Sequence, residues 1–207
     1  RRRVQMVFEG PFARLNPRMP VCDLITDPAR IHHRLSHRTR KALAADLLQK
    51  VGLEPAAADR FPHQFSGGQR QRLCIARALS VRPALIVADE AVSALDVSVQ
   101  AQIINLLMDL QKDLGLALLF ISHDLAVVEH MSARIAVMYL GRIMEIADRD
   151  AIFRHPRHPY TKALLSAVPL PGPSAKRDRV VLTGDGPRPI APPCGGFVRP
   201  RCPLATD

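Results

Sequence analysis

The sequence is poor in residues on which several protein classes depend. It has no tryptophan, two tyrosines and four cysteines among its 207 residues. Surfaces that stack nucleic-acid bases need aromatic side chains, so the net charge of +10, which is spread along the chain, does not indicate nucleic-acid binding. Four scattered cysteines are too few for a disulfide framework, and we therefore expect a reducing compartment.

Long apolar stretches are absent as well. No uninterrupted apolar run approaches the roughly 20 residues of a membrane-spanning helix, and residues 1–5 are not followed by a signal-peptide core. We therefore expect a cytosolic chain that attaches to a membrane only through partners. The chain starts without methionine, close to a predicted strand at residues 4–8, and we expect both of its ends to be cut.

The first 82 residues are predicted to form a strand, a loop up to residue 20 and then a mainly helical segment at 21–82. Helical spacing is clear at residues 38–52, where Gly52 is expected to stop the helix. The predicted buried stripe of this helix consists of Ala42, Ala45, Leu48 and Val51.

A different pattern follows. Residues 84–88 form a short apolar run typical of a fully buried parallel strand, and residues 117–121 form a second one. Between them, residues 97–114 have the helical period, with Asp96 at the expected N-cap. Strand, helix and strand predict a βαβ unit, whose right-handed crossover brings the carboxyl ends of both strands to one edge of the sheet.

Three polar side chains stand at these carboxyl ends, where open α/β sheets bind their ligands. Asp89 and Glu90 end the first strand, and the pair fits one carboxylate that holds hydrated Mg²⁺ and one that activates water. His123 follows the second strand and is placed to sense a terminal phosphate. Two solvated carboxylates and a merely hydrogen-bonded histidine are the alternative interpretation.

The octapeptide at residues 65–72, FSGGQRQR, predicts the start of a helix that runs to about Leu79. A capping serine followed by two glycines presents free backbone N–H groups and the positive end of a helix dipole to an anion. An ordinary helix cap is the alternative. Further along, residues 134–140 and 142–147 predict a hairpin, and a tail rich in Pro, Gly and Arg begins at residue 169.

Together, FSGGQRQR at 65–72, LIVADEAVSALD at 85–96 and ISHD at 121–124 resemble the ATP-binding cassette (ABC) ATPases, over at least residues 4–155. The resemblance implies an α/β fold of the P-loop NTPase class, with ATP and Mg²⁺ as cofactors. It also implies a dimer of ATPase subunits in which each nucleotide is enclosed by both subunits.

The resemblance also implies a role for each matching residue. Asp89 holds Mg²⁺ through water, Glu90 is the catalytic carboxylate and His123 contacts the γ-phosphate. Asp96 belongs to a loop at the dimer interface. The residues expected to contact the ATP of the partner subunit are Ser66, Gly67, Gly68 and Gln69.

Four further runs narrow the resemblance to the oligopeptide and dipeptide importer ATPases: residues 16–19, 63–65, 93–98 and 158–165. The implied function is ATP hydrolysis that energises import of peptides or related small solutes. The implied partners are a second ATPase subunit, identical or paralogous, two transmembrane permeases and a periplasmic or extracellular solute-binding protein, with no nucleic acid. The implied location is peripheral, on the cytoplasmic face of the inner or plasma membrane.

The expected organisation has two parts. Residues 1–155 form a partial ABC ATPase domain that is incomplete at its N-terminus, with a helical subdomain at 21–82 and the catalytic strands at 83–155. Residues 156–207 form a Pro-rich C-terminal extension.

The sequence departs from the family pattern in several places. No G-x-x-x-x-G-K-[ST] loop occurs, so we expect this chain alone to bind ATP negligibly and to be inactive. Glu9 stands at the position of a metal-contacting glutamine; a carboxylate still ligates Mg²⁺ but repels phosphate. Only Cys194 and Cys202 lie in the tail, which is too few thiolates for an iron–sulfur cluster. No pair of potential ligands has the close sequence spacing of a zinc site.

Two alternatives remain open. We expect an importer ATPase; the alternative, motivated by Glu9 and the missing loop, is a degenerate or truncated subunit that only completes the site of a partner. A DNA-repair or translation ABC ATPase would need a zinc-finger insertion or a second cassette, and neither is visible in the sequence.

Overall fold

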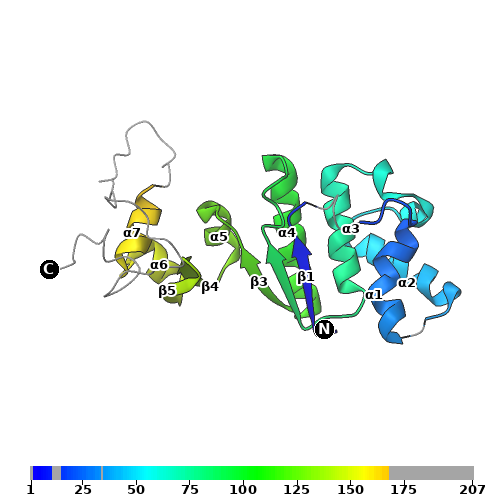
Figure 1. Cartoon of the computed structure of the whole chain (residues 1–207), viewed down its shortest axis with the longest axis horizontal. Coiled ribbons are helices and arrows are strands. Elements are labelled where there is room, and N and C mark those ends of the chain that lie inside the picture. The colour runs from blue at the N-terminus through cyan, green and yellow to red at the C-terminus, as the bar shows by residue number, and fades with distance from the viewer. Residues whose placement is uncertain (1, 11–14, 34, 168–207) are drawn as a thin grey trace. The chain divides into compact units, whose positions relative to one another are not determined.

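The computed structural model describes residues 2–10, 15–33 and 35–167, and the chain divides into two compact units, residues 1–123 and 124–207. Figure 1 shows the elements of each unit. The first unit contains β1 (Val4–Phe8), α1 (Val21–His33), α2 (His37–Lys50), η2 (Pro55–Asp59), η3 (Pro62–Gln64), α3 (Gly67–Leu79), β2 (Leu85–Asp89), α4 (Val97–Leu114) and β3 (Ala117–Ile121). The second contains α5 (Leu125–Met131), β4 (Arg134–Tyr139), β5 (Arg142–Asp148), α6 (Arg149–Arg154) and α7 (Pro159–Ser166).

A three-stranded parallel sheet organises the first unit, in the order β1-β2-β3. Its register places Phe8 opposite Asp89 and Asp89 opposite Ile121, so all three strands end at the same edge. The predicted βαβ unit is confirmed as β2-α4-β3, with a parallel pairing of the two strands. The common edge is what brings distant parts of the sequence together.

The two faces of this sheet differ in burial. On one face Val7, Ile86 and Ala88 are buried. On the other face, Val4, Met6 and Leu119 are 45%, 47% and 51% exposed. The prediction of a fully buried strand at 84–88 is therefore wrong for Ala84, Leu85 and Val87, because an apolar run does not distinguish a sheet covered on both faces from one covered on a single face.

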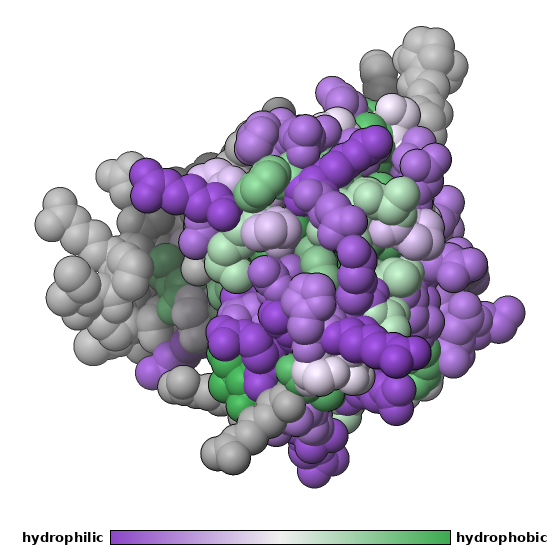
Figure 2. All heavy atoms as spheres, turned by 90° about the vertical axis from the view of Figure 1, so that its right-hand side faces the viewer, coloured by the Kyte–Doolittle hydropathy of each residue, from purple (hydrophilic) through white to green (hydrophobic). Residues whose placement is uncertain are grey.

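Helices fill the segment between β1 and β2, as predicted for residues 21–82. In α2 the Ser36 hydroxyl caps the N-terminus by accepting the Thr39 N–H, and Gly52 follows the C-terminus with a φ of +71°. The predicted stripe is only partly confirmed: Leu48 and Val51 are buried, but Ala42 is exposed, and Ala44 and Leu47 are buried in addition. Figure 2, which views the molecule from this side, shows a surface made mainly of hydrophilic residues.

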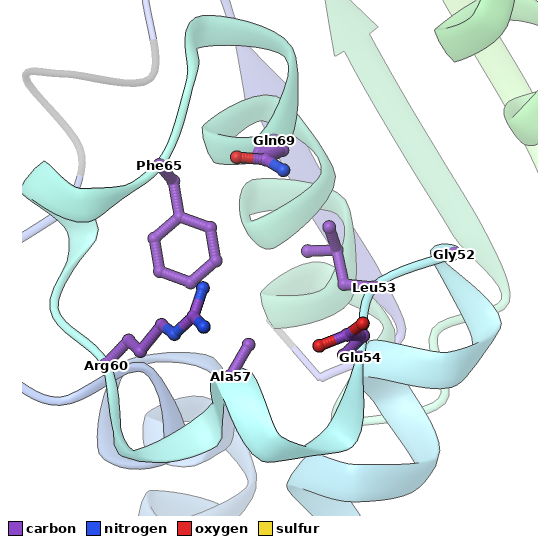
Figure 3. Close-up of a pocket in the computed structure, with 7 residues that line it drawn as sticks. All are labelled: Gly52, Leu53, Glu54, Ala57, Arg60, Phe65 and Gln69. Carbon is purple, nitrogen blue, oxygen red and sulfur yellow. The ribbon is translucent and has the colours of Figure 1, made fainter.

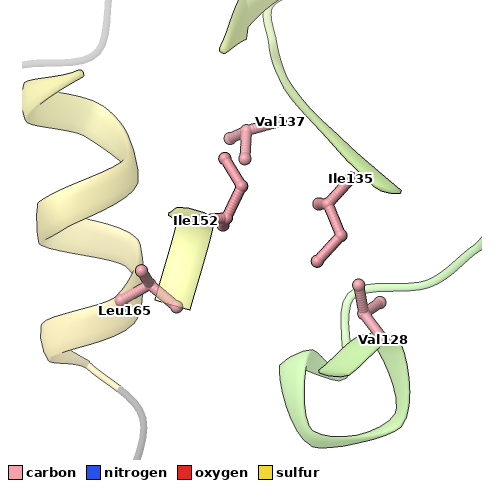
Figure 4. Close-up of a cluster of buried hydrophobic side chains, with 5 residues drawn as sticks. All are labelled: Val128, Ile135, Val137, Ile152 and Leu165. Atoms are coloured by element: carbon pink, nitrogen blue, oxygen red, sulfur yellow. The ribbon is translucent and has the colours of Figure 1, made fainter. Parts of the chain in front are cut away.

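The second unit is built on the antiparallel hairpin β4–β5, which confirms the predicted hairpin. Leu140 and Gly141 both have positive φ, at 49° and 76°, the backbone of a two-residue hairpin turn that follows the twist of the strands. The hydrophobic core of this unit is drawn in Figure 4. It consists of Val128, Ile135, Val137, Ile152 and Leu165.

Helix α7 is held to the hairpin by a carboxylate. The Glu145 side chain on β5 accepts the backbone N–H groups of Arg157 at 2.8 Å and His158 at 3.1 Å, just before α7 begins. The rings of Tyr139 and Tyr160 make a second link, with centroids 4.5 Å apart. These contacts fix the start of the segment 158–165, which the sequence singled out, to β4 and β5. Over the described residues, no helix is both long and apolar enough to cross a membrane.

Candidate functional site

Glu90 and His123 meet at the carboxyl edge of the sheet. Each follows the end of a strand, Glu90 after β2 and His123 two residues after β3. The Glu90 N–H donates to the Ile121 carbonyl at 3.0 Å, which extends the strand pairing, and His123 Nδ1 lies 3.4 Å from Glu90 Oε1. The convergence predicted from the βαβ topology is confirmed. The imidazole is 73% exposed and the carboxylate 37%, so both are open to a ligand.

The backbone at Glu90 is unusual. Its φ of +47° lies in the left-handed region, which costs a residue with a side chain about 1–2 kcal/mol. The following turn is closed by the Ser93 N–H, which donates to the Glu90 carbonyl at 3.2 Å. A non-glycine residue held in this conformation, at a strand end and beside a histidine, is the kind of local strain that occurs at functional sites.

Glu9 lies at the same edge. It directly follows Phe8, the last residue of β1, just as Glu90 follows Asp89 on the neighbouring strand. The Ser93 hydroxyl donates to Glu9 Oε1 at 2.9 Å and also lies 2.9 Å from the Glu90 carbonyl oxygen. Sequence reasoning placed Glu9 near the site but missed this contact, because residues 84 positions apart give no local signal. In the sequence, only Ser93, three residues after Glu90, indicates a turn at this point.

Asp89, Glu90 and Glu9 offer oxygen atoms, which Mg²⁺ prefers, so the chemistry of these side chains fits the metal named in the prediction. Over the described part of the chain, however, no group of three or more His, Cys, Asp or Glu side chains is placed to hold a metal ion directly. A hydrated ion held through water by one carboxylate needs no such group. Cys194 and Cys202, considered above for a cluster, lie outside the described residues.

The second predicted region is the N-terminus of α3. Ser66 is its N-cap, and a reciprocal capping box forms: Ser66 Oγ accepts the Gln69 N–H at 3.3 Å, and Gln69 Oε1 accepts the Ser66 N–H at 3.0 Å. The N–H groups of Gly67 and Gly68 belong to the first turn and have no acceptor within the helix. The end of α3 therefore retains the donors that would suit an anion, and the side chains around them are already fixed.

The two glycines have different surroundings. A Cβ at Gly68 would lie 2.4 Å from Val99 Cγ1 on α4, whereas a Cβ at Gly67 would meet Leu95 at 3.8 Å. Close packing of α3 on α4 thus explains the glycine at 68 without any ligand. Asp96, the remaining predicted residue, is the N-cap of α4; its exposed side chain makes no capping hydrogen bond within the described chain.

The predicted site residues of these two regions do not hydrogen-bond to one another in the described part of the chain. Among the hydrogen bonds of the described residues, none links Ser66 or Gln69 to Glu90 or His123. A pocket of about 290 Å³, which the sequence did not indicate, opens beside Gln69 (Figure 3). It is lined by Gly52, Leu53, Glu54, Ala57, Arg60, Phe65 and Gln69. Glu90 and His123 do not contribute to it.

Two family models match the chain. Residues 1–93 match the family described as "ABC transporter", and residues 144–207 match "Oligopeptide/dipeptide transporter, C-terminal region". The first match lies within the first unit and contains the motif at residues 65–72 and the start of the one at 85–96, and the second match lies within the second unit and contains the motif at 158–165.

Curated relatives match along the full chain. This chain is 60% identical over 207 residues to the "Probable peptide ABC transporter ATP-binding protein y4tS" of Sinorhizobium fredii, and the match covers 100% of this chain and 59% of that protein. It is 52% identical to the "Dipeptide transport ATP-binding protein DppF" of Haemophilus influenzae, covering 100% of this chain and 63% of the relative. The chain thus spans about three fifths of the length of these relatives.

The fold is also found among solved structures. The chain matches cbiO1 of Clostridium perfringens, described as part of the ABC transporter complex cbiONQ, with a TM-score of 0.66 and 25% identity, over 74% of this chain and 60% of that one. The mixed helix and strand order, the parallel sheet and this match agree on the ABC ATPase fold of the P-loop NTPases. The chain belongs to the ATP-binding proteins of ABC transporters, in the group that carries the oligopeptide/dipeptide-transporter C-terminal region.

Proposed function

We propose that this chain is part of an ATP-hydrolysing subunit that energises ABC import of peptides or related small solutes. The observation that carries the proposal is the meeting of Glu90 and His123, with 3.4 Å between Nδ1 and Oε1, at the edge where Asp89 ends β2. A carboxylate for water, a carboxylate for a hydrated cation and a histidine for phosphate are the groups that hydrolysis of a nucleotide requires at one place.

Each side chain has a proposed task. Asp89 holds Mg²⁺ through water, and the metal, when bound, supplies positive charge at the phosphate oxygens. Glu90 accepts a proton from the attacking water, and its exposed carboxylate is open to that water. His123 donates a hydrogen bond to the terminal phosphate, and the neighbouring Glu90 carboxylate orients its imidazole. Glu9 adds a third carboxylate at this edge, which would repel phosphate.

The N-terminus of α3 serves a different nucleotide in this proposal. Ser66, Gly67, Gly68 and Gln69 contact the ATP that a second ATPase subunit holds. In support, no hydrogen bond joins the side chains of Ser66 or Gln69 to Glu90 or His123 among the described residues, and the N–H groups of Gly67 and Gly68 have no acceptor within α3. Asp96, exposed at the start of α4, would lie at the interface of the two subunits.

The remaining partners and the solute are inferred from the relatives. Their printed names describe peptide and dipeptide transport, and residues 144–207 match the corresponding C-terminal region. We infer a complex with two transmembrane permeases and a solute-binding protein, at the cytoplasmic face of the membrane. Di- or oligopeptides are the proposed solutes.

The test is an ATPase assay of the complete gene product, comparing the wild type with Glu90→Gln. We expect turnover to fall at least about 100-fold, the usual contribution of general-base catalysis, while ATP binding is retained. Glu129→Gln on α5, an exposed carboxylate of the second unit, is the matched control and should leave turnover unchanged. Equal turnover in Glu90→Gln and the wild type would remove Glu90 from its proposed role.

A second candidate function is a subunit that hydrolyses no ATP itself and completes the site of its partner. Glu9, which stands where the family pattern has glutamine, is the observation that favours it. The same assay separates the two: the complete gene product alone would show no turnover, yet adding it to the partner subunit would raise the turnover of the partner. If the Glu9 carboxylate is what abolishes hydrolysis, Glu9→Gln would then restore ATPase activity to this gene product.

A further inference from the structure

Gln71 is a buried polar residue whose role the motif interpretation leaves unexplained. It lies on α3, two residues after Gln69, and is 1% exposed. Its Nε2 lies 3.4 Å from the backbone carbonyl of Phe8, at the long end of hydrogen-bond distances. Its Oε1 is buried and has no hydrogen-bond partner among the described residues.

Burying an amide with one long hydrogen bond and one unpaired oxygen has a desolvation cost that its hydrogen bonding does not offset. Methionine has nearly the same length and shape and would carry no desolvation penalty. Packing alone therefore does not account for glutamine at this position. What the amide provides and an apolar side chain cannot is a donor directed at the end of β1.

The carbonyl that Gln71 contacts belongs to a residue with further connections. Phe8 pairs with Asp89 in the sheet, and Glu9 follows it directly. The Glu9 carboxylate accepts the Ser93 hydroxyl at 2.9 Å, and Ser93 closes the turn that begins at Glu90. A continuous series of contacts thus runs from α3 to the end of β1 and from there to the turn after β2.

We infer that Gln71 is a positioning residue that fixes the carboxyl end of β1 and, through the Glu9–Ser93 hydrogen bond, the turn that carries Glu90. The same helix presents its N-terminus to the nucleotide of the partner subunit, so a movement of α3 reaches the catalytic carboxylate through this series of contacts. The inference rests on the proposed function only for this last consequence; the positioning itself is a property of the fold.

Hydrogen exchange tests the positioning role of Gln71 without an ATPase measurement. In Gln71→Met we expect the backbone amides of residues 90–95 to exchange at least threefold faster than in the wild type. Gln111→Met, an exposed glutamine of α4, is the matched control and should leave this segment unchanged. Unchanged exchange at 90–95 in a folded Gln71→Met would overturn the inference.

A second variant covers the case in which Gln71→Met does not fold. Ser93→Ala breaks the same series at its other end, on an exposed residue. We expect faster exchange at the backbone amides of Glu9 and Gly10 with α3 still protected, while Ser98→Ala, on the exposed first turn of α4, leaves them unchanged. If the protection of Glu9 and Gly10 does not depend on Ser93, the link does not exist.

ATPase kinetics of the complete gene product distinguish a positioning role from a purely structural one, which would not change kcat selectively. Gln71→Met should lower kcat at least about tenfold while KM for ATP changes less than about twofold, because the amide positions the base rather than binding ATP. If the wild type has no ATPase activity, the proposed function fails, and the exchange experiments still decide the role of Gln71. Normal kcat together with faster exchange at residues 90–95 would show that Gln71 positions the turn but that this positioning does not affect catalysis.

Discussion

Gly68 lies where no larger side chain fits, since a Cβ there would be 2.4 Å from Val99 Cγ1. We expect Gly68→Ala to lower the free energy of unfolding by about 1–3 kcal/mol, because overpacking forces α3 and α4 apart. Gly67→Ala is the matched control, as its Cβ meets nothing closer than 3.8 Å and alanine favours a helix. Urea denaturation of the chain measures both.

Val99→Ala sharpens this test, because it removes the methyl groups that a side chain at position 68 would meet. In that background Gly68→Ala should cost much less than it does alone. An equal cost in both backgrounds would show that the glycine is needed for its backbone and not for the close approach of α3 to α4.

Glu90 combines a proposed catalytic carboxylate with a left-handed backbone, and two substitutions separate these properties. Glu90→Ala and Glu90→Gly both remove the carboxylate, but only glycine adopts a φ of +47° without strain. We expect Glu90→Gly to be more stable than Glu90→Ala by about 1 kcal/mol, measured as the free energy of unfolding in urea. Equal stabilities would mean that the turn relaxes when the side chain is lost.

At the scale of elements, the attachment of α7 to the hairpin depends on the ionisation of one carboxyl. Burial raises the pKa of Glu145, but the polar Thr161 side chain and the N–H groups of Arg157 and His158, which donate to the carboxylate, outweigh it and lower that pKa below the ordinary value of 4.5. The ionised form is therefore favoured in the folded state.

A lowered pKa makes stability depend on pH in a definite direction. The contribution of Glu145 is fully present above its ordinary pKa and is lost as the pH falls through the lowered one. We expect Glu145→Gln to lower Tm by a few degrees at pH 7, and the difference from the wild type to shrink below pH 4.5. Calorimetry with Glu129→Gln as control measures it; a pH-independent difference would point to lost shape rather than lost charge.

Elements were more predictable than the contacts between them. The strands at 4–8 and 117–121 and the helix at 97–114 have the predicted bounds, because short apolar runs and a long 3.6-residue period are local signals. The stripe of α2 was predicted less well, since alanine is small enough for either face of a helix. The contact of Glu90 with His123 was predictable because topology alone brings the two strand ends together.

The contacts of Gln71 and Ser93 could not be predicted in the same way. They join residues 63 and 84 positions apart, and they depend on how α3 and the turn after β2 pack on the end of β1. Nothing in the spacing of Gln71 distinguishes it from any other polar residue on a helix, and its burial is the decisive observation. The roles of the predicted site residues, and the domain boundary at 155/156, stay predictions.

At the scale of the whole molecule, these 207 residues contain no G-x-x-x-x-G-K-[ST] run. If such a loop supplies three charge-assisted hydrogen bonds of about 2 kcal/mol each, its absence costs roughly 6 kcal/mol, or about 10⁴ in affinity. We expect isothermal titration of this chain alone to detect negligible ATP binding. Micromolar affinity would show that the groups at the sheet edge suffice without the loop.

The contact between the rings of Tyr139 and Tyr160 has a practical consequence for all of these measurements. They are the two tyrosines of the sequence, both lie in the second unit, and the sequence has no tryptophan. Intrinsic tyrosine fluorescence therefore reports on that unit alone. A single tryptophan introduced into the first unit, for example Phe120→Trp on β3, would give that unit a separate emission, so that one titration could follow the unfolding of each unit by its own wavelength.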